Sequence, residues 1–161
     1  GFTVHGLAAV SLDGRIVSST RIREAIRAGE LDAASQMLGR PYAISGRVMA
    51  GDRVGRRLGF PTANLDVRGL ILPPNGVYAG LTKIRKKPHR VALNIGFRPT
   101  MASAARQLRV EAHLLDFGGN LYGEELTIEI DAKLRKEKKF GSSAELRRQI
   151  SRDIAVLRAL A

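Results

Sequence analysis

The sequence predicts a mainly β protein, an antiparallel barrel or sandwich with a C-terminal helix packed on it. From residue 42 onward, short β-like runs are separated by Gly and Pro. The last of these runs alternates strictly between apolar and polar residues, and after residue 141 the pattern becomes helical. Closure into a barrel is favoured over a sandwich because it removes exposed strand edges.

The first forty residues are expected to differ from the rest of the chain. Phe2–Val10 has a β-like bias, and Asp13-Gly14 is a turn signal. Ser18 begins a run of N-cap residues ahead of an amphipathic stretch that Gly29 ends. A second short helix is predicted over Leu31–Leu38. This segment therefore reads as strand, helix, helix.

The β-rich part contains five runs that resemble strands. In the last run, Ile128 and Ile130 lie on one face and Glu129 on the other, which is typical of a half-buried strand. The predicted strands are Ala43–Ala50, Gly76–Thr82, Arg90–Gly96, Leu108–Asp116 and Glu125–Ala132.

The C-terminal segment is predicted to be an amphipathic helix. Residues 142–145 have the capping-box pattern Ser-Ser-Ala-Glu. Leu146, Ile150, Ile154 and Leu157 then form one apolar stripe. We expect this stripe to pack against the barrel, with a partner-binding helix as the alternative.

Composition excludes several classes of protein. The 161 residues, 44% of them hydrophobic, suffice for one ordinary domain with a small appendage. The absence of Cys excludes a disulfide scaffold, a Cys-ligated zinc site and a thiol nucleophile. No apolar run approaches the roughly 18 residues of a membrane span, and no charged n-region followed by an apolar h-region suggests export, so a cytoplasmic protein without membrane contact is expected.

The charge favours a polyanionic partner. Lys and Arg number 27 against 15 Asp and Glu, which gives a formal net charge of +12. A nucleic acid, a membrane surface or the phosphates of a nucleotide would each suit this charge. Only 5% of residues are aromatic, so stacking platforms for single-stranded nucleic acid are sparse.

Catalytic motifs built on histidine or a Walker A loop are absent. The pattern G-x-x-x-x-G-K-[ST] does not occur. His5, His89 and His113 lie far apart without metal-ligand spacing, which argues against a His-based metal site or a Ser-His-Asp triad. We expect His113 to be a structural or surface histidine.

The densest chemical signal lies in residues 51–64, where three glycines recur at intervals of four, interleaved with three arginines. Glycine lets the backbone approach an anion closely, and arginine supplies charge-assisted donors to phosphate. Thr62 and Asn64 are two residues apart, so an extended segment places both on one side. Their oxygen atoms suit Mg²⁺. From the residues alone, a flexible basic hairpin loop remains the alternative.

The run Gly-Arg-Arg-Leu-Gly-Phe-Pro-Thr-Ala-Asn-Leu resembles the Pro-Thr-Ala-Asn signature of the riboflavin kinase family. Four further segments resemble that family in the same order, so that the resemblance covers roughly residues 40–158. They are Leu72–Ala79, Asn94–Thr100, Glu111–Gly123 and Lys133–Phe140. The resemblance implies a six-stranded antiparallel Greek-key barrel with a helix packed on it.

The resemblance also implies a reaction, the Mg²⁺-dependent transfer of the γ-phosphoryl group of ATP to riboflavin, which gives FMN and ADP. Thr62 and Asn64 match metal-binding positions, and Thr62 also matches a phosphate contact. Glu111 matches the catalytic acid residue, and strand alternation places it opposite Val110 and Ala112, facing the ligand or solvent. The other nucleotide-binding positions are Gly51, Arg56, Leu114, Asp116 and Tyr122, and the flavin-binding positions are Arg135, Lys138 and Phe140.

The first forty residues show a second resemblance. Val17–Arg23 is similar to the last motif of the nucleotidyltransferase module in the bacterial bifunctional riboflavin kinase/FAD synthetase. The His-x-Gly-His element expected upstream is not present, and the chain does not begin with Met. We therefore expect residues 1–40 to be the tail of that module, residues 41–161 to be the kinase domain, and FAD synthesis to be absent. An N-capped helix without a ligand is the alternative for Val17–Arg23.

Two other functions remain open from the sequence. A basic β-barrel that binds nucleic acid would explain the charge, although its basic clusters lack interleaved aromatic residues. A flavin-binding regulatory module without catalysis would keep the same fold, although Thr62, Asn64 and Glu111 are all present. The kinase interpretation is preferred, with riboflavin, FMN, ATP and ADP as ligands and no nucleic acid.

Overall fold

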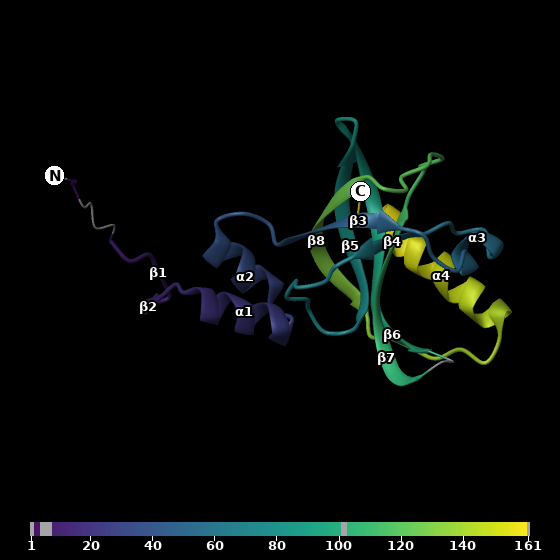
Figure 1. The fold of residues 1–161 in the computed structure, drawn as a ribbon, viewed down its shortest axis with the longest axis horizontal. Helices are drawn as coiled ribbons and strands as arrows, with labels where there is room; N and C mark the ends of the chain where they lie inside the picture. Colours follow the sequence, from purple (N-terminus) through teal and green to yellow (C-terminus); the bar gives the residue numbers. More distant parts are fainter. Residues whose placement is uncertain (1, 4–7, 101–102, 161) are drawn as a thin grey trace.

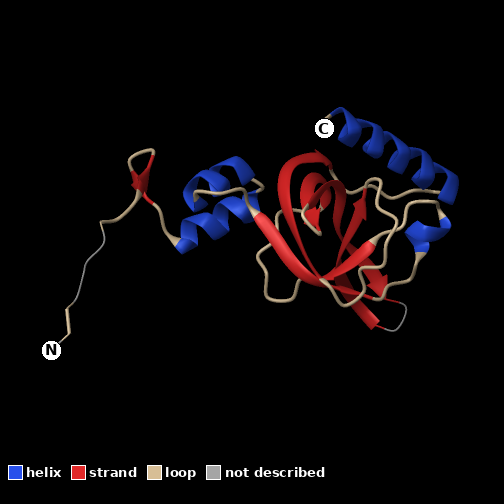
Figure 2. Cartoon of the chain, turned by 90° about the horizontal axis from the view of Figure 1, so that it is seen from above, coloured by secondary structure: helices blue, strands red, loops and turns tan. Residues whose placement is uncertain are grey.

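The computed structural model describes residues 2–3, 8–100 and 103–160. A β-barrel occupies its centre, with α1 (Ser19–Ala28) and α2 (Leu31–Leu38) at one side. At the opposite side lie α3 (Val54–Arg57) and α4 (Ser143–Ala159), as Figures 1 and 2 show. The barrel, the two N-terminal helices and the C-terminal helix occupy the segments of the chain in which the sequence predicts them.

The barrel is closed by six antiparallel strands in the order β3-β4-β7-β6-β5-β8. Strands β5, β6 and β7 follow one another as hairpins, and β8 returns beside β5, which makes a Greek key. The six-stranded Greek-key barrel is thus confirmed. The strands are β3 (Ala43–Met49), β4 (Ala63–Asp66), β5 (Gly76–Ile84), β6 (Lys87–Thr100), β7 (Ser103–Leu114) and β8 (Glu125–Arg135).

Alternation along the strands fills the barrel with apolar side chains. The alternation predicted for β8 is confirmed, because Ile128 and Ile130 are buried. In β7, Val110 and Ala112 are buried inside the barrel, so Glu111 faces outward. Other fully buried residues of the barrel core include Ile44, Tyr78, Val91, Leu93 and Ile95. One face of β4, β6 and β7 is therefore available outside the barrel for polar side chains.

The N-terminal segment begins with a two-stranded hairpin instead of the expected long β run. Strands β1 (Ser11–Leu12) and β2 (Arg15–Ile16) are joined at Asp13-Gly14, where both residues have positive φ, as the turn signal predicts. Residues 4–7 of the Phe2–Val10 run lie outside the described residues, and the described residues 2–3 and 8–10 form no strand. At the end of this run the Val10 carbonyl oxygen accepts one hydrogen bond from the Val17 backbone N–H at 2.8 Å, beside the hairpin. A single such bond does not extend the strand, because a stable strand needs a ladder of them.

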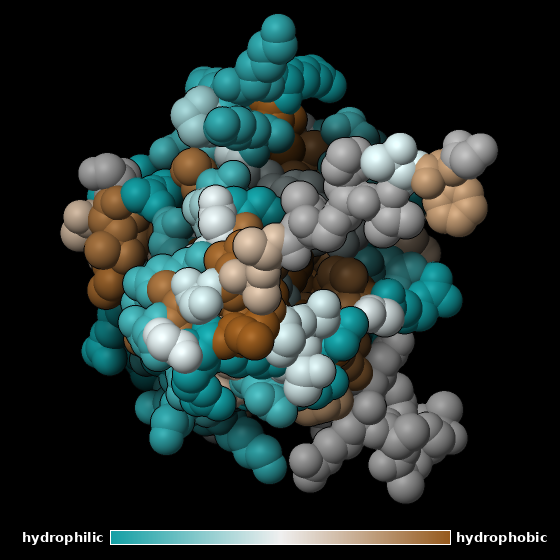
Figure 3. All heavy atoms as spheres, turned by 90° about the vertical axis from the view of Figure 1, so that its left-hand side faces the viewer, coloured by the Kyte–Doolittle hydropathy of each residue, from teal (hydrophilic) through white to brown (hydrophobic). Residues whose placement is uncertain are grey.

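Helix α1 begins and ends at its predicted cap residues, and α2 has its predicted bounds. The Ser18 hydroxyl accepts a hydrogen bond from the Arg21 backbone N–H at 3.2 Å, and Gly29 ends α1 in the left-handed conformation. Ile26 and Leu31 belong to the same hydrophobic cluster as the barrel interior. The helix pair therefore packs on the barrel and shares its core. The face at the N-terminal side mixes hydrophilic and hydrophobic side chains (Figure 3).

Helix α4 starts at the predicted cap. The Ser142 hydroxyl accepts from the Glu145 backbone N–H at 3.2 Å, while the Glu145 carboxylate accepts from the Gly141 N–H at 3.1 Å. Leu157 is fully buried against the outside of the barrel, in a cluster with Ala79 and Leu115. The predicted packing of the helix is thus confirmed. In the described part of the chain, no helix combines the length and the hydropathy that crossing a bilayer requires.

Candidate active site

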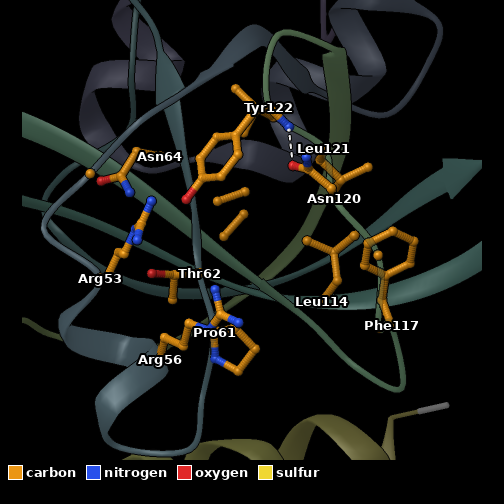
Figure 4. Close-up of a pocket in the computed structure, with 16 residues that line it drawn as sticks. Arg53, Arg56, Pro61, Thr62, Asn64, Leu114, Phe117, Asn120, Leu121 and Tyr122 are labelled. Carbon is orange, nitrogen blue, oxygen red and sulfur yellow. Dashed lines mark hydrogen bonds between the residues drawn. The ribbon is translucent and has the colours of Figure 1, made fainter.

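Two pockets adjoin on the side of the barrel that carries α3. The larger has a volume of about 600 Å³ and lies between the α3 segment and the loop that follows β7. Figure 4 shows arginine, threonine and asparagine side chains at one of its walls and aromatic and leucine side chains at the other. Its lining includes Gly51, Arg53, Arg56, Thr62, Asn64, Leu114, Phe117, Asn120, Leu121 and Tyr122.

The smaller pocket, of about 260 Å³, is lined by residues of β5, β6, β7 and β8 and by residues of α3 and α4. Apolar side chains of both helices and of the loops beside them form much of its wall, and polar side chains of the strands form its base. Thr62 lines both pockets. The apolar lining is Val54, Leu58, Phe60, Val77, Ala92, Phe140, Leu146 and Ile150, and the polar lining includes Asn94, Glu111, His113, Arg135, Glu137, Lys138 and Asp153.

The glycines of residues 51–59 serve this site in three different ways. A Cβ on Gly51 would lie 2.1 Å from the Asn64 amide nitrogen, so this glycine makes room for the Asn64 side chain. A Cβ on Gly55 would lie 2.4 Å from the Phe60 carbonyl oxygen and 3.1 Å from the Thr62 hydroxyl oxygen. Gly59 has a φ of 89°, a left-handed conformation that glycine adopts without strain. The glycine pattern therefore supports the placement of Thr62 and Asn64.

Thr62 and Asn64 lie beside the side chains of Arg53 and Arg56 in the larger pocket (Figure 4). None of the carboxylates in the described part of the chain forms an ion pair with either arginine. Arg53 has a φ of 56°, in the region that favours glycine. Two unneutralised guanidinium groups next to hydroxyl and amide oxygens make this wall suitable for phosphate groups.

A metal ion at this wall would share its ligands with phosphate. Among the residues that the structure describes, no group of three His, Asp or Glu side chains can hold a metal. Thr62 and Asn64 offer one hydroxyl and one amide oxygen, both neutral. Mg²⁺ usually keeps several waters and takes few protein ligands together with substrate phosphates, so this donor set fits it.

Glu111 of β7 lines the smaller pocket. It is paired with Asn64 across β4 and β7, and with Asn94 across β6 and β7. Directly opposed residues of neighbouring strands point to the same face, so these three side chains form a polar row outside the barrel. The row leads from the pocket wall that carries Thr62 and Asn64 to the smaller pocket. It therefore brings the Glu111 carboxylate close to the wall that suits phosphate groups.

His113, two residues after Glu111 on β7, has a structural role. Its Nδ1 lies 2.8 Å from the Pro61 carbonyl oxygen, and because a carbonyl only accepts, Nδ1 carries the hydrogen. The Phe60 ring contacts the imidazole edge to face, with centroids 5.8 Å apart. His113 therefore ties β7 to the residues immediately before Thr62.

The opposite wall of the larger pocket is the loop after β7. Leu114 at the end of β7 and Leu121 in the loop are buried, and the Asn120 side chain accepts a hydrogen bond from the Tyr122 backbone N–H at 3.0 Å. The Tyr122 side chain is half-exposed and points into the pocket (Figure 4). An aromatic ring and two leucines at this wall suit the flat, apolar face of a nucleobase.

Every predicted site residue except Asp116 lines one of the two pockets. Asp116 points toward α4, where Arg158 donates two hydrogen bonds to its carboxylate at 2.7 and 3.1 Å. These hydrogen bonds hold the pKa of Asp116 below its ordinary value. In this structure Asp116 thus ties the loop to α4.

The structure also adds residues that the sequence did not single out. Asp153 of α4 lines the smaller pocket and accepts hydrogen bonds from Arg135. Gln149 of the same helix donates a hydrogen bond to Asp153. Glu137 packs over Gly96, where a Cβ would lie 2.3 Å from its carboxylate oxygen. The sequence could have pointed to Asp153 only through its place beside the apolar stripe of the helix, once that side of the helix is known to be buried.

The Greek-key barrel thus carries an arginine-lined pocket, a second, largely apolar pocket that shares Thr62 with it, and a carboxylate, Glu111, in the lining of the second. Such a pair of pockets suits an anionic ligand beside an apolar one. The sequence model of the riboflavin kinase family matches residues 38–161. The chain belongs to the riboflavin kinase family.

Curated relatives agree with this assignment. The bifunctional riboflavin kinase/FMN adenylyltransferase of Pseudomonas fluorescens is 44% identical over 161 residues, which are 100% of this chain and 51% of that protein. The protein of the same description from Escherichia coli (strain K12) is 42% identical over 154 residues, 95% of this chain and 49% of the relative. The chain thus spans about half the length of these relatives.

Solved structures share the fold. A protein described as a macrolide-efflux protein from Streptococcus pneumoniae superposes with a TM-score of 0.81 and 32% identity, covering 93% of this chain and 49% of the other. Riboflavin kinase from Trypanosoma brucei gives a TM-score of 0.53 and 25% identity, covering 74% of this chain and 79% of the other.

Proposed function

We propose that this chain transfers the γ-phosphoryl group of ATP to the 5′-hydroxyl of riboflavin and releases FMN and ADP. The observation that carries the proposal is Thr62, which lines both pockets. A nucleotide in the larger pocket and a flavin in the smaller one would meet at this residue. Catalysis of phosphoryl transfer consists largely of such positioning together with neutralisation of charge.

The larger pocket takes the nucleotide in this proposal. Gly51, Arg56 and Thr62 bind the phosphates, and Leu114 and Tyr122 contact the rest of the nucleotide. Thr62 and Asn64 hold Mg²⁺, which when bound neutralises charge on the phosphate oxygens. Asp116 acts on this site through the loop that it ties to α4.

Glu111 is the proposed general base. Its carboxylate takes the proton of the riboflavin hydroxyl as that oxygen attacks the γ-phosphorus, and the bond from the γ-phosphorus to the bridging oxygen of ADP breaks. Its position in the polar row next to Asn64 supports this role, because the row joins the phosphate wall to the smaller pocket.

The smaller pocket takes the flavin. Phe140 offers a ring for stacking, and the Arg135 guanidinium and Lys138 ammonium groups lie 5.9 and 5.8 Å from its centroid. The apolar side chains of α3 and α4 on the remaining walls exclude water from the ring system.

FMN and not FAD is the proposed product. Residues 1–40 correspond in this proposal to the end of a nucleotidyltransferase module. Within them the Ser18 hydroxyl caps α1, and one Arg21 nitrogen donates to the carbonyl oxygens of Leu12 and Arg15 at 3.2 and 2.9 Å. These internal bonds support an N-capped helix that binds no ligand.

The test is incubation of the chain with riboflavin, ATP and Mg²⁺, followed by chromatographic separation of FMN and FAD. We expect FMN without FAD, and a loss of FMN formation in Glu111→Gln. Formation of FAD would overturn the proposal for residues 1–40. Riboflavin binding without any product would favour the non-catalytic flavin-binding module instead.

A further inference from the structure

Asp153 of α4 is a buried carboxylate that the proposed reaction does not use. Its side chain is 9% exposed, and among the described residues it is the only buried Asp or Glu. It lines the smaller pocket from the helix side. A buried charge is costly unless it is fully paired, so the contacts of Asp153 need an explanation.

Asp153 is engaged by two side chains from different elements. Arg135 of β8 donates from Nε to both carboxylate oxygens at 3.0 Å and from Nη2 to Oδ2 at 2.8 Å. Gln149, one turn earlier on α4, donates to Oδ1 at 2.9 Å. The pair is bidentate, which fixes the orientation of the guanidinium plane as well as its position.

The orientation of Arg135 matters because of what lies beside it. Its Nη1 donates to the Lys136 carbonyl oxygen at 3.1 Å, and its guanidinium carbon lies 5.9 Å from the centroid of the Phe140 ring. Lys138 approaches the same ring, but none of the described carboxylates forms an ion pair with it. Among the described ion pairs, the one beside Phe140 holds Arg135 and leaves Lys138 out.

Stability alone does not account for this arrangement. A buried ion pair contributes little net stability compared with apolar side chains of similar size, because both ions lose their hydration. Leu146, Ile150 and Leu157 on the same helix show that an apolar residue is compatible with this face. A bidentate ion pair, unlike an apolar contact, fixes the plane of the Arg135 guanidinium group in the wall of the pocket.

We infer that Asp153 is a positioning residue for flavin binding: it holds the Arg135 guanidinium group beside Phe140, so that this wall is formed before the flavin enters. A preformed wall raises affinity because the side chains lose less conformational freedom on binding. The inference rests on the proposed function, since it assigns the smaller pocket to the flavin. Asp153 acts through Arg135 and contacts neither reacting group.

The variants Asp153→Asn, Arg135→Gln and their double test the inference. Asparagine keeps the shape and one acceptor oxygen but loses the charge. We expect Asp153→Asn to weaken riboflavin binding about tenfold, the loss of one charge-assisted contact. The KM for ATP should stay within about twofold. Because both side chains act as one unit, the double variant should bind riboflavin no more weakly than Arg135→Gln alone.

Riboflavin affinity is measured directly, by quenching of flavin fluorescence without ATP, and the KM values for riboflavin and ATP are measured with the melting temperature of each variant. Asp131→Asn is the matched control, since Asp131 pairs with Arg90 at 2.5 Å outside both pockets. Gln149→Leu removes only one donor and leaves the ion pair intact. It should weaken riboflavin binding by a few-fold and keeps the inference testable if Asp153→Asn does not fold.

Several outcomes would overturn the inference. One is wild-type riboflavin affinity in Asp153→Asn, or in Gln149→Leu where only that variant folds. Another is an equal rise of both KM values together with a lowered melting temperature, which would indicate a structural role alone. A wild-type chain that neither binds riboflavin nor forms FMN would instead overturn the proposed function itself.

Discussion

Gly51→Ala is the substitution for which the structure makes the sharpest prediction. A methyl group at this position would lie 2.1 Å from the Asn64 amide nitrogen, 2.6 Å from its Cγ and 2.9 Å from its amide oxygen. Each of these distances is too short for a van der Waals contact, so the Asn64 side chain must move. The atoms that move belong to the end of a side chain, and the backbone of β4 can stay in place.

The expected effect is therefore on the nucleotide site and not on stability. The φ of Gly51 lies outside the left-handed region, so alanine is compatible with the backbone there. We expect the free energy of unfolding to change by less than about 1 kcal/mol. A lost contact between the Asn64 oxygen and a charged ligand is worth about 1.5–3 kcal/mol, which corresponds to about 10- to 150-fold in kcat/KM for ATP.

The assay is FMN formation at saturating riboflavin, with ATP and Mg²⁺ each varied, alongside urea unfolding of every variant. Gly141→Ala is the neutral control, because its Cβ would meet the nearest atom at an ordinary 3.6 Å. Gly55→Ala is the contrasting variant, since its Cβ would lie 2.4 Å from a backbone oxygen and should cost about 1–3 kcal/mol of stability. A stable Gly51→Ala variant in which FMN formation depends on the ATP and Mg²⁺ concentrations as it does in the wild type would refute the role of Asn64.

Three further outcomes are expected. Glu111→Gln should lower kcat by about 10²–10⁴ while riboflavin affinity, measured by fluorescence, stays within about threefold. Asp116→Asn should change the KM for ATP by less than about threefold, because its carboxylate faces Arg158 and not the pocket; a larger rise would show direct contact with the nucleotide. Burial raises the pKa of Tyr42 from its ordinary 10.0 to about 12, so this phenol stabilises the fold fully below pH 10, and that contribution is lost as the pH rises toward 12. Urea midpoints at pH 9, 10 and 11 should fall more steeply for the wild type than for Tyr42→Phe, and parallel curves would contradict this.

Periodicity predicted the long strands but not their ends. The β5–β6 hairpin turns at Arg85 and Lys86, which have φ values of 50° and 70°. Such turns usually carry Gly or Asn, so two basic residues gave no turn signal, and both strands were predicted too short. Strand β4 was missed because its four residues contain a single buried apolar side chain, Leu65, which is too few for alternation to be visible.

The glycine-rich segment shows what local pattern alone leaves open. Its glycines were expected to let the backbone approach phosphate. In the structure, Gly51 and Gly55 are required because the side chains of Asn64 and Thr62 occupy the space beside them. Both explanations predict glycine at the same positions. The choice between these explanations depends on how the loop folds back on β4, because that fold brings Gly51 beside Asn64 and Gly55 beside Thr62. The sequence pattern alone does not reveal this fold.

Contacts between distant segments were the least predictable part of the site. Asp153 of α4 accepts hydrogen bonds from Arg135 of β8, which lies eighteen residues earlier in the chain. The sequence showed only a charge within an apolar helical stripe and a run of basic residues, each of which reads as a solvated surface by itself. The charge at position 153 carries information only when the buried side of the helix is known, since a carboxylate there needs a partner.

The position of Thr62 in both pockets has a consequence for how these contacts combine. Asn64 is displaced by changes at Gly51 on the nucleotide side, and Arg135 by changes at Asp153 on the flavin side. Neither change requires the backbone at Thr62 to move, because two hydrogen bonds hold the residues just before it: from the Phe60 N–H to the Gly55 carbonyl oxygen and from His113 to the Pro61 carbonyl oxygen. Effects of Gly51→Ala and Asp153→Asn on FMN formation should therefore add as free energies. Coupling between them would mean that the shared wall itself is displaced.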